Sequence, residues 1–312
     1  MKPQQKKFYL GVEGGGTKST AVLVNENDVV LGQREGKSIS YHSVGEQKVK
    51  ANIASLLGPL LKKTAGAKTR IVFGLAGLNT PKEETLYKKI IRSVLPRDCA
   101  FNVVNDAKIA LESRCPNVKN RILVISGTGS SVYGESGKKS AKTIGWDYLV
   151  ADEGSGYQFG LQASRAVIQA WDGRGEKTVL QKLLLKTMKV KNVEDLLAKI
   201  YNDIINKQKS PKYYFASLAP LIDEAIESND QVALRIRKEA GQELVKGVWA
   251  VANRLQITKK SFGLGFMGST WNMPGFQSQF KNEVKKQFPK VWFSNIDEPC
   301  IWGAVLLAKK LK

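Results

Sequence analysis

Short apolar runs, each ended by glycine or polar residues, open the chain. Residues 8–13, 20–24 and 28–33 have the length and composition of strands. The glycine turn Gly14–Gly16 separates the first two, and Asn25-Glu26-Asn27 separates the second from the third. Because such turns join consecutive strands, the pattern predicts a three-stranded meander.

Helical periodicity then alternates with strand-like runs. Apolar residues recur at helical spacing over residues 46–63, and a strand-like run follows at 70–75. A second helical pattern covers 82–94 and a further strand covers 100–104. This alternation predicts a sheet with helices packed on it.

The same order of elements begins again at residue 121. A strand in RILVIS, the turn Gly127-Thr128-Gly129 and two strands in SSVYGE and SAKTIG repeat the meander. A helix near 155–171 leads into a largely helical region that ends at about 257. The remaining pattern predicts a strand at 262–267, a helix at 277–287, a strand at 291–295 and a helix at 300–311.

This repetition predicts an α/β protein made of two related domains. We expect two copies of a βββαβαβα unit, a cleft between the domains and an all-helical insertion in the second. The boundary is expected near residue 117, with an N-terminal domain over 1–117 and a C-terminal domain over 118–312. The closing helix either stays with the second domain or packs back on the first.

Length and composition agree with this organisation. The chain has 312 residues, of which 42% are hydrophobic and 25% charged, as expected for a globular protein with two cores. The apolar run near the start breaks at Gly11 and Glu13, which is too short for a signal peptide or a membrane span. We therefore expect a cytoplasmic protein with no membrane partner. Cys99, Cys115 and Cys300 are scattered and do not form a metal-binding pattern.

The net charge of +21 changes the picture only a little. Such a charge attracts phosphates, nucleic acids or acidic membranes where it is concentrated. Here the lysines are spread along the chain, often as pairs such as Lys62-Lys63, Lys88-Lys89 and Lys285-Lys286. No basic tail or basic stripe with interleaved aromatic residues is present, so the pattern favours a solvated surface over a nucleic-acid partner.

The segment GVEGGGTKST (11–20) is the first with candidate chemistry. Gly14, Gly15 and Gly16 allow a ligand to approach the backbone closely, and the exposed N–H groups of such a turn can bind an anion. Thr17 and Lys18 follow directly. The segment is not a Walker A loop, and it leads into a strand where a dinucleotide-binding turn leads into a helix. Taken alone, a plain hairpin turn explains it equally well.

A second glycine turn supports phosphate binding. ISGTGSSV (125–132) has the same strand–turn–strand form, with Gly127, Thr128 and Gly129 in the turn and Ser130 directly after it. Small hydroxyl residues can contact a phosphate chain or a sugar without blocking it. Two such hairpins facing one another could hold the phosphates of a nucleotide, so coincidence becomes the weaker explanation.

Five motifs in this order resemble the N-acetylglucosamine kinase and BadF/BadG/BcrA/BcrD ATPase family. They are GVEGGGTKS (11–19), VVNDA (103–107), ISGTGS (125–130), GWDYLVADEGSGY (145–157) and FGLGFMGS (262–269). The resemblance covers nearly the whole chain. It implies a duplicated ribonuclease-H-like fold of the actin-like ATPase superfamily, and transfer of the ATP γ-phosphoryl group to an amino sugar of the N-acetylglucosamine type, with the 6-hydroxyl as the expected acceptor.

The resemblance also implies roles for two carboxylates. Asp106 corresponds to the general base that accepts the proton of the attacking sugar hydroxyl. The structural alternative is a helix N-cap, a role that Asn105 and Asp106 could both fill. Glu13 is expected to hold Mg²⁺, directly or through water. ATP and Mg²⁺ are therefore the expected cofactors.

The remaining site residues are likewise implied by the family. They are Gly14, Gly15, Gly16, Thr17, Lys18, Gly127, Thr128 and Gly129 for the ATP phosphates, Gly265, Gly268 and Ser269 for adenosine, and Asn105, Asp106, Ser130, Trp146 and Asp152 for the sugar. A solvated lysine is nearly as good an explanation of Lys18, and Asp152 could instead cap the helix that follows it. Two departures leave the sugar open, because Asp147 stands where relatives have glycine and Ser40 where many have asparagine.

Two other functions compete with the kinase. Within the same family, some members are ATPases that energise a redox partner through a cysteine-bound iron–sulfur cluster, for which Cys99 and Cys115 lack the expected spacing. A regulatory or nucleic-acid-binding protein without catalysis is the third possibility, and the joint presence of Glu13, Asp106 and Asp152 argues against it. A homodimer is compatible with the family and common among oligomers.

Overall fold

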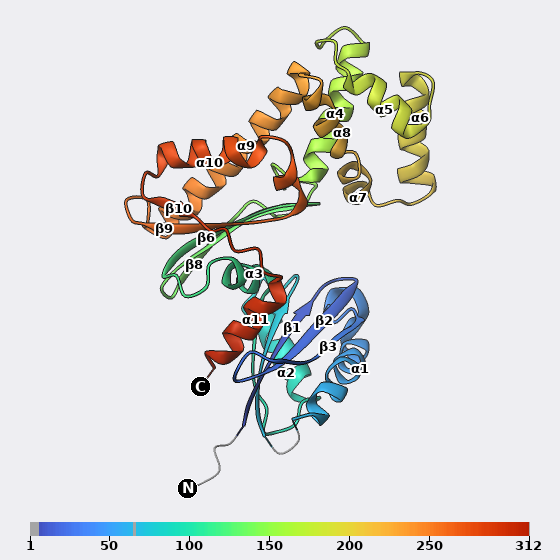
Figure 1. Ribbon diagram of the computed structural model, residues 1–312. Helices are drawn as coiled ribbons and strands as arrows, with labels where there is room; N and C mark the ends of the chain where they lie inside the picture. Colours follow the sequence, from blue (N-terminus) through green and yellow to red (C-terminus); the bar gives the residue numbers. More distant parts are fainter. Residues whose placement is uncertain (1–5, 65–66, 312) are drawn as a thin grey trace. The chain divides into compact units, whose positions relative to one another are not determined.

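The computed structural model of the protein describes residues 6–64 and 67–311 (Figure 1). Residues 1–5 of the basic start lie outside these ranges, whereas the apolar run that breaks at Gly11 and Glu13 lies within them. Within them, no helix has the length and apolar character needed to cross a membrane.

The chain forms two compact units. The first consists of Met1–Val118 together with Asn295–Lys312, and the second of Lys119–Ser294. The closing helix therefore belongs to the first unit, which is one of the two arrangements that the sequence left open.

The sheet of the first unit has the strand order β3-β2-β1-β4-β5. Its strands are β1 (Lys7–Gly14), β2 (Lys18–Asn25), β3 (Val30–Lys37), β4 (Lys68–Leu75) and β5 (Ala100–Asn105). β1, β2 and β3 pair antiparallel as the predicted meander, whereas β4 and β5 run parallel to β1.

Helices cover both faces of this sheet. Helices α1 (Tyr41–Lys62) and α2 (Pro81–Arg92) share one hydrophobic core with Leu10 and Val12 of β1. Helices α3 (Asp106–Arg114) and α11 (Cys300–Lys309) form the core on the opposite face, which contains Tyr9. The alternation of side chains along β1 is that of a strand buried on both sides.

Glycines allow α11 to approach its neighbours closely. A Cβ on Gly11 of β1 would lie 2.8 Å from the carbonyl oxygen of Ile301, and a Cβ on Gly303 would lie 1.8 Å from the carbonyl oxygen of Ile109 in α3. Side chains at either position would push α11 away. The close packing ties the chain's last helix to the strand that carries Glu13.

The sheet of the second unit has the order β10-β9-β6-β7-β8. Its strands are β6 (Asn120–Ser126), β7 (Ser130–Ser136), β8 (Lys139–Thr143), β9 (Phe262–Met267) and β10 (Val291–Phe293). β6, β7 and β8 pair antiparallel, and β9 and β10 run parallel to β6. Read from the other edge, order and strand directions are those of the first sheet. Two mixed sheets with packed helices confirm the predicted α/β class.

Helices dominate the stretch between β8 and β9. They are α4 (Gly156–Trp171), α5 (Leu180–Met188), α6 (Val193–Tyr201), a π-helical turn (Asn202–Asn206), α7 (Pro211–Ala216), α8 (Pro220–Glu227) and α9 (Gln231–Arg254). The long helix α9 contacts β6, β7 and β8. After β9 come a 3-10 turn (Ser269–Asn272) and α10 (Phe276–Gln287).

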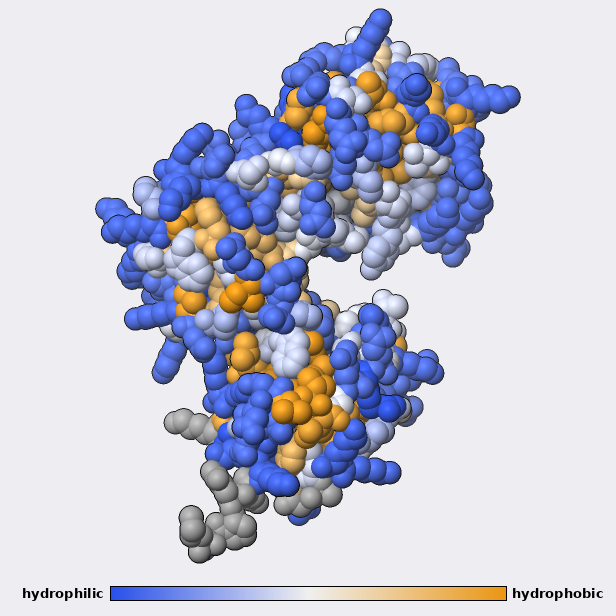
Figure 2. Space-filling model, viewed as in Figure 1, coloured by the Kyte–Doolittle hydropathy of each residue, from blue (hydrophilic) through white to orange (hydrophobic). Residues whose placement is uncertain are grey.

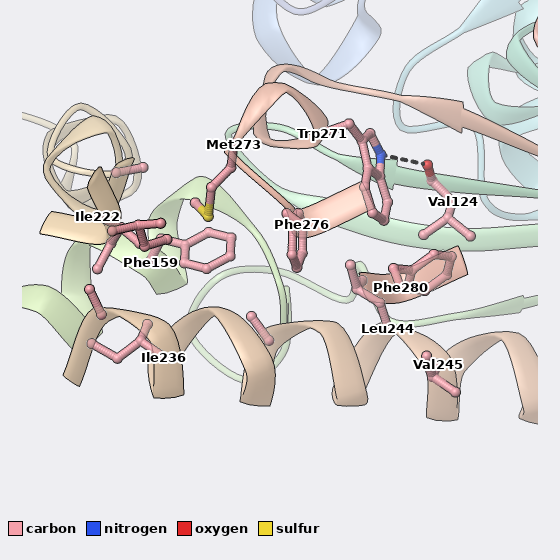
Figure 3. Close-up of a cluster of buried hydrophobic side chains, with 14 of the residues drawn as sticks. Val124, Phe159, Ile222, Ile236, Leu244, Val245, Trp271, Met273, Phe276 and Phe280 are labelled. Atoms are coloured by element: carbon pink, nitrogen blue, oxygen red, sulfur yellow. Dashed lines mark hydrogen bonds between the residues drawn. The ribbon is translucent and has the colours of Figure 1, made fainter. Parts of the chain in front are cut away.

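An aromatic cluster anchors the segment after β9 (Figure 3). The ring of Trp271 stacks on Phe276 at 5.0 Å between centroids, and Phe159 of α4 meets Phe276 edge-on at 5.4 Å. The indole N–H of Trp271 donates to the carbonyl oxygens of Val124 and Met267 at 3.3 and 3.1 Å, so this buried polar atom is satisfied. The cluster thereby fixes residues 268–272 against β6.

Hydrophilic residues cover most of the surface visible in Figure 2. Of the lysine pairs in the sequence, Lys62-Lys63, Lys88-Lys89 and Lys285-Lys286 are exposed. Their charge is thus spread over solvated helix ends.

Candidate active site

Two predicted site residues stand at the same edge of the first sheet. In the strand register, Glu13 is paired with Gly74, and Gly74 with Val104, the second-last residue of β5. Asp106 follows two positions later, as the first residue of α3. Because β1, β4 and β5 are parallel, both carboxylates lie at the carboxyl ends of strands, where open α/β sheets bind ligands.

The electrostatics of Glu13 suit a bound cation. Burial raises the pKa of Glu13, the negative charge of Asp106 raises it further, and Lys18 lowers it. Two carboxylates close enough to repel one another are stabilised by a divalent ion. Mg²⁺ takes hard oxygen ligands and is usually held by one or two carboxylates plus phosphates and water. The donor set therefore fits the predicted metal.

Asp106 is not needed as the helix cap. Asn105 is the N-cap of α3: its side-chain oxygen accepts from the Ala107 N–H at 2.8 Å, and its amide donates to the Leu78 carbonyl oxygen at 2.9 Å. Asp106 Oδ1 accepts from the same Ala107 N–H at 2.8 Å. Since the cap is already supplied by Asn105, capping alone gives no reason for a carboxylate at residue 106.

The three glycines of the first hairpin differ in what the fold demands of them. None of the three has a positive φ, so backbone conformation does not explain why glycine stands at these positions. A Cβ on Gly14 would lie 2.6 Å from side-chain carbons of Ile39 and Leu75. In contrast, Gly16 is exposed, and its Cβ would meet only Ser43 Oγ, at 3.5 Å. Close packing requires glycine at position 14. At position 16 packing does not require it, and an exposed backbone that a ligand can approach is the remaining reason for glycine there.

Lys18 and Thr17 are exposed beside this turn. Lys18 Nζ lies 3.1 Å from Glu35 Oε1, and both side chains are mostly solvated. Exposed pairs of this kind are weak, so the pair leaves Lys18 able to move to a phosphate. The solvated-lysine alternative therefore stays open.

Cys300 is a neighbour of the carboxylates that the sequence did not reveal. Its thiol pKa is raised to about 12, first by burial and then by the negative charges of Glu13 and Asp106, with Arg114 acting in the opposite direction. Cys300 is the first residue of α11, nearly 200 positions from Asp106 in the sequence. At neutral pH it is a neutral thiol.

The glycine turn of the second unit is joined to the start of α4. Within the turn, the Gly127 N–H donates to the Gly129 carbonyl oxygen at 2.9 Å. The carbonyl oxygens of Gly127 and Thr128 accept from the N–H groups of Gly156 and Tyr157 at 2.6 and 3.2 Å. The carbonyl oxygens of the turn thus accept hydrogen bonds from N–H groups in the first turn of α4, which have no partner within the helix.

Two of the predicted adenosine-binding residues lie against this turn. A Cβ on Gly127 would be 3.5 Å from Gly268 Cα and 3.9 Å from the Ser269 nitrogen. Gly268 has a φ of 108°, and a Cβ there would lie 2.0 Å from the Ser126 carbonyl oxygen, so only glycine fits. By contrast, Gly265 is buried inside β9, opposite Leu123. The structure brings Gly268 and Ser269, but not Gly265, to the turn Gly127–Gly129.

A cavity of about 160 Å³ opens between these segments. Gly127, Thr128 and Ser269 line it together with residues that the sequence did not single out: Gly156, Ala216, Ala219, Pro220, Asp223, Thr270 and Met273. Burial and two nearby glutamates raise the pKa of Asp223. Its Oδ1 is shielded from solvent and has no hydrogen-bond partner in the part of the chain that the structure describes. Ala216, Ala219, Pro220 and Asp223 come from α7, α8 and the link between them, a segment that contains no recognisable motif.

Asp152 is buried and ion-paired. It is 2% exposed and has a left-handed φ of 73°, and its Oδ2 accepts from Lys212 Nζ at 2.9 Å. The next residue, Glu153, accepts from Ser130 Oγ through its carbonyl oxygen at 2.7 Å. The predicted sugar-binding residues Asp152 and Ser130 are therefore held by the same short segment. Helix capping does not explain Asp152, because the N-cap of α4 is Ser155.

Trp146 projects from the loop before Asp152. Its side chain is 66% exposed, with Lys142 Nζ 5.4 Å from the ring centroid. Asp147 has a φ of 110°, a conformation that favours glycine, and its Oδ1 accepts from the Leu149 N–H at 3.2 Å. Asp147, a predicted departure from the family pattern, thus has a backbone conformation that glycine adopts more readily.

Comparisons with known proteins show which family and which relatives this chain is similar to. The model of the BadF/BadG/BcrA/BcrD ATPase family matches residues 10–308. An N-acetylmuramic acid/N-acetylglucosamine kinase of Clostridium acetobutylicum is 32% identical over 309 residues, covering 97% of this chain and 98% of that protein. An N-acetyl-D-glucosamine kinase of Dictyostelium discoideum is 28% identical over 320 residues, covering 98% and 99%.

Solved structures share the fold. A candidate N-acetylglucosamine kinase from Chromobacterium violaceum superposes with a TM-score of 0.68 at 23% identity, over 96% of this chain and 98% of that one. A ROK family glucokinase from Streptomyces griseus, in complex with glucose and AMPPNP, gives a TM-score of 0.55 at 16% identity, over 97% and 99%.

Proposed function

We infer the function from the family to which this chain belongs, the BadF/BadG/BcrA/BcrD ATPase family, together with its full-length relatives. Those relatives phosphorylate amino sugars, by their names, and align with 97% and 98% of this chain. The chain is an ATP-dependent carbohydrate kinase, and its acceptor is an amino sugar. We propose that this sugar is N-acetylglucosamine or glucosamine, phosphorylated on the 6-hydroxyl.

The observation that carries the proposal is the pair of carboxylates at one edge of the first sheet. The charge of Asp106 raises the pKa of Glu13, so the two groups act on each other. In the proposed mechanism Asp106 accepts the proton of the sugar hydroxyl as its oxygen attacks the γ-phosphorus. Glu13 holds Mg²⁺, which neutralises phosphate charge when bound.

The second unit supplies nucleotide and sugar contacts in this proposal. The turn Gly127–Gly129 binds phosphates, and the 160 Å³ cavity beside it takes part of the nucleoside, next to Gly268 and Ser269. Asp152 and Ser130 bind the sugar, with Trp146 and the Asn105 side chain of the first unit as further contacts. Gly14, Gly15, Gly16, Thr17 and Lys18 keep their predicted part in phosphate binding.

We further propose that the two units arose by duplication of one ribonuclease-H-like domain. The equal strand order and directions of their sheets support this. Helices α5–α8 would then be an insertion into the second copy. A homodimer and a cytoplasmic location are also part of the proposal.

A coupled ADP-release assay over a panel of sugars tests the function. With Mg²⁺ and ATP, turnover should rise many-fold on addition of an amino sugar. Plain hexoses and a no-sugar sample serve as controls. ATP turnover that ignores every sugar but depends on a redox partner would support the activating ATPase instead.

A further inference from the structure

Lys212 meets two predicted site residues at once. Its Nζ donates to Asp152 Oδ2 at 2.9 Å. A Cβ on Gly129 would lie 2.8 Å from that oxygen and 2.9 Å from Lys212 Nζ itself. The ammonium therefore lies against the backbone of the glycine turn that we propose to bind phosphates.

The position of Lys212 is fixed by the packing of α7 on α4. Pro211 starts α7, and Lys212 is its second residue. A Cβ on Gly160 of α4 would lie 1.8 Å from the Phe215 carbonyl oxygen, so the two helices are in close contact. Tyr157 and Phe215 meet edge-on at 5.9 Å between ring centroids. Only 28% of the Lys212 side chain is exposed, as expected for a positioned group.

The negative charge on the transferred phosphoryl group needs a cation close to it. The residues predicted from sequence include the carboxylates Glu13, Asp106 and Asp152, but only one lysine, Lys18, which is solvated and paired with Glu35. In phosphoryl transfer, charge spreads over the oxygens of the transferred group, and neutralising it dominates catalysis. An ammonium has three N–H donors, and the hydrogen bonds among the described residues use one of them.

We propose that Lys212 neutralises the phosphoryl group during its transfer, and that the bond to Asp152 fixes where the ammonium stands. This rests on the proposed kinase function. The sugar oxygen forms a bond to the γ-phosphorus as the bond from phosphorus to the ADP oxygen breaks. The hydroxyl proton goes to Asp106, and Lys212 keeps all its protons throughout. The competing explanation is that Lys212 only compensates the buried charge of Asp152.

Lys212→Gln separates the two explanations, because glutamine can still donate to Asp152 but carries no charge. The kcat for sugar phosphorylation should fall at least about 10²-fold, the usual effect of losing one group that stabilises transition-state charge. Sugar affinity, measured by calorimetry with N-acetylglucosamine, should change less than about threefold. Lys212→Arg should recover part of kcat, because the charge is restored.

Lys209→Gln is the matched control. Lys209 also pairs with a buried carboxylate, that of Asp203, at 3.1 Å, and Lys199 and Lys207 remain beside Asp203 when it is changed. This variant should keep the wild-type kcat. If Lys212→Gln folds poorly, the same change in an Asp152→Asn background leaves no buried charge unpaired. Compared with the Asp152→Asn single variant, the double variant with Lys212→Gln should have a lower kcat and an unchanged sugar affinity.

Two results would overturn the proposal. A Lys212→Gln enzyme with kcat within about threefold of wild type removes the need for the charge. If Lys212→Gln lowers sugar affinity as much as it lowers kcat, Lys212 acts only by compensating and positioning Asp152. If instead the wild type shows no sugar-dependent ATP turnover, the kinase function itself fails, and this inference fails with it.

Discussion

Asp106→Asn should separate chemistry from folding. The side chain keeps its size and an oxygen that can accept from the Ala107 N–H, now 2.8 Å from Oδ1. Asn105 caps α3 independently through its own bond to the same N–H. The lost charge costs about 0.3–1 kcal/mol of helix-dipole stabilisation, partly offset because Glu13 no longer faces a like charge. The melting temperature should therefore fall by no more than about 4 °C.

The effect on turnover should be much larger. A placed base contributes about 10²–10⁴ in rate. At about 1.36 kcal/mol per tenfold change, this range corresponds to about 2.7–5.4 kcal/mol of barrier. The assay is coupled ADP release with N-acetylglucosamine, alongside calorimetry of sugar binding and a melting curve on the same preparation. Near-normal turnover in a normally folded variant would refute Asp106 as the base.

Two further substitutions test the roles of Glu13 and Gly268. Burial and a neighbouring carboxylate raise the pKa of Glu13, so the folded protein loses stability as the pH rises through that pKa. In urea denaturation, the Glu13→Gln variant should be more stable than wild type at neutral pH and should lose this advantage below about pH 4. Mg–ATP should stabilise the variant less than it stabilises wild type. A variant less stable than wild type at neutral pH would contradict this account of Glu13. Gly268→Ala should cost about 2–5 kcal/mol in urea unfolding, from left-handed strain plus overlap with the Ser126 carbonyl 2.0 Å away. Gly137→Ala, with a φ of 61° and no atom within 4 Å, is its control and should cost only about 1–2 kcal/mol; equal losses in both variants would count against the overlap.

The order of strands and helices could be predicted because its signals are local. Apolar alternation and glycine turns placed β1, β2, β6 and β7 to within a few residues. Helix α1 starts at Tyr41, five residues before the predicted start, because Gly45 interrupts the periodicity with a φ of 75°. Strand β3 starts at Val30, later than predicted, because Asp28 takes a left-handed φ of 62° in the turn before it. Turn backbone angles of this kind are not encoded in hydrophobic periodicity.

Candidate site residues could be named from the sequence only where a motif marks them. Glu13, Asp106 and the glycine turns stand at strand ends, where sequence context gives a physical reason for each. Lys212, Asp223 and Cys300 reach their places through helix packing, and the segments around them carry no pattern that indicates chemistry. Lys212 is 60 residues from its partner Asp152, a pairing that one sequence without an alignment does not reveal.

Product stoichiometry tests the central claim most directly. The purified protein would be incubated with ATP, Mg²⁺ and N-acetylglucosamine, and ADP, inorganic phosphate and phosphosugar would be quantified together, with the phosphorylated hydroxyl located by NMR. A sugar kinase makes one phosphosugar for every ADP and releases almost no inorganic phosphate, and we expect the phosphate on the 6-hydroxyl. ADP and inorganic phosphate in equal amounts, with no phosphosugar from any amino sugar tried, would contradict the account.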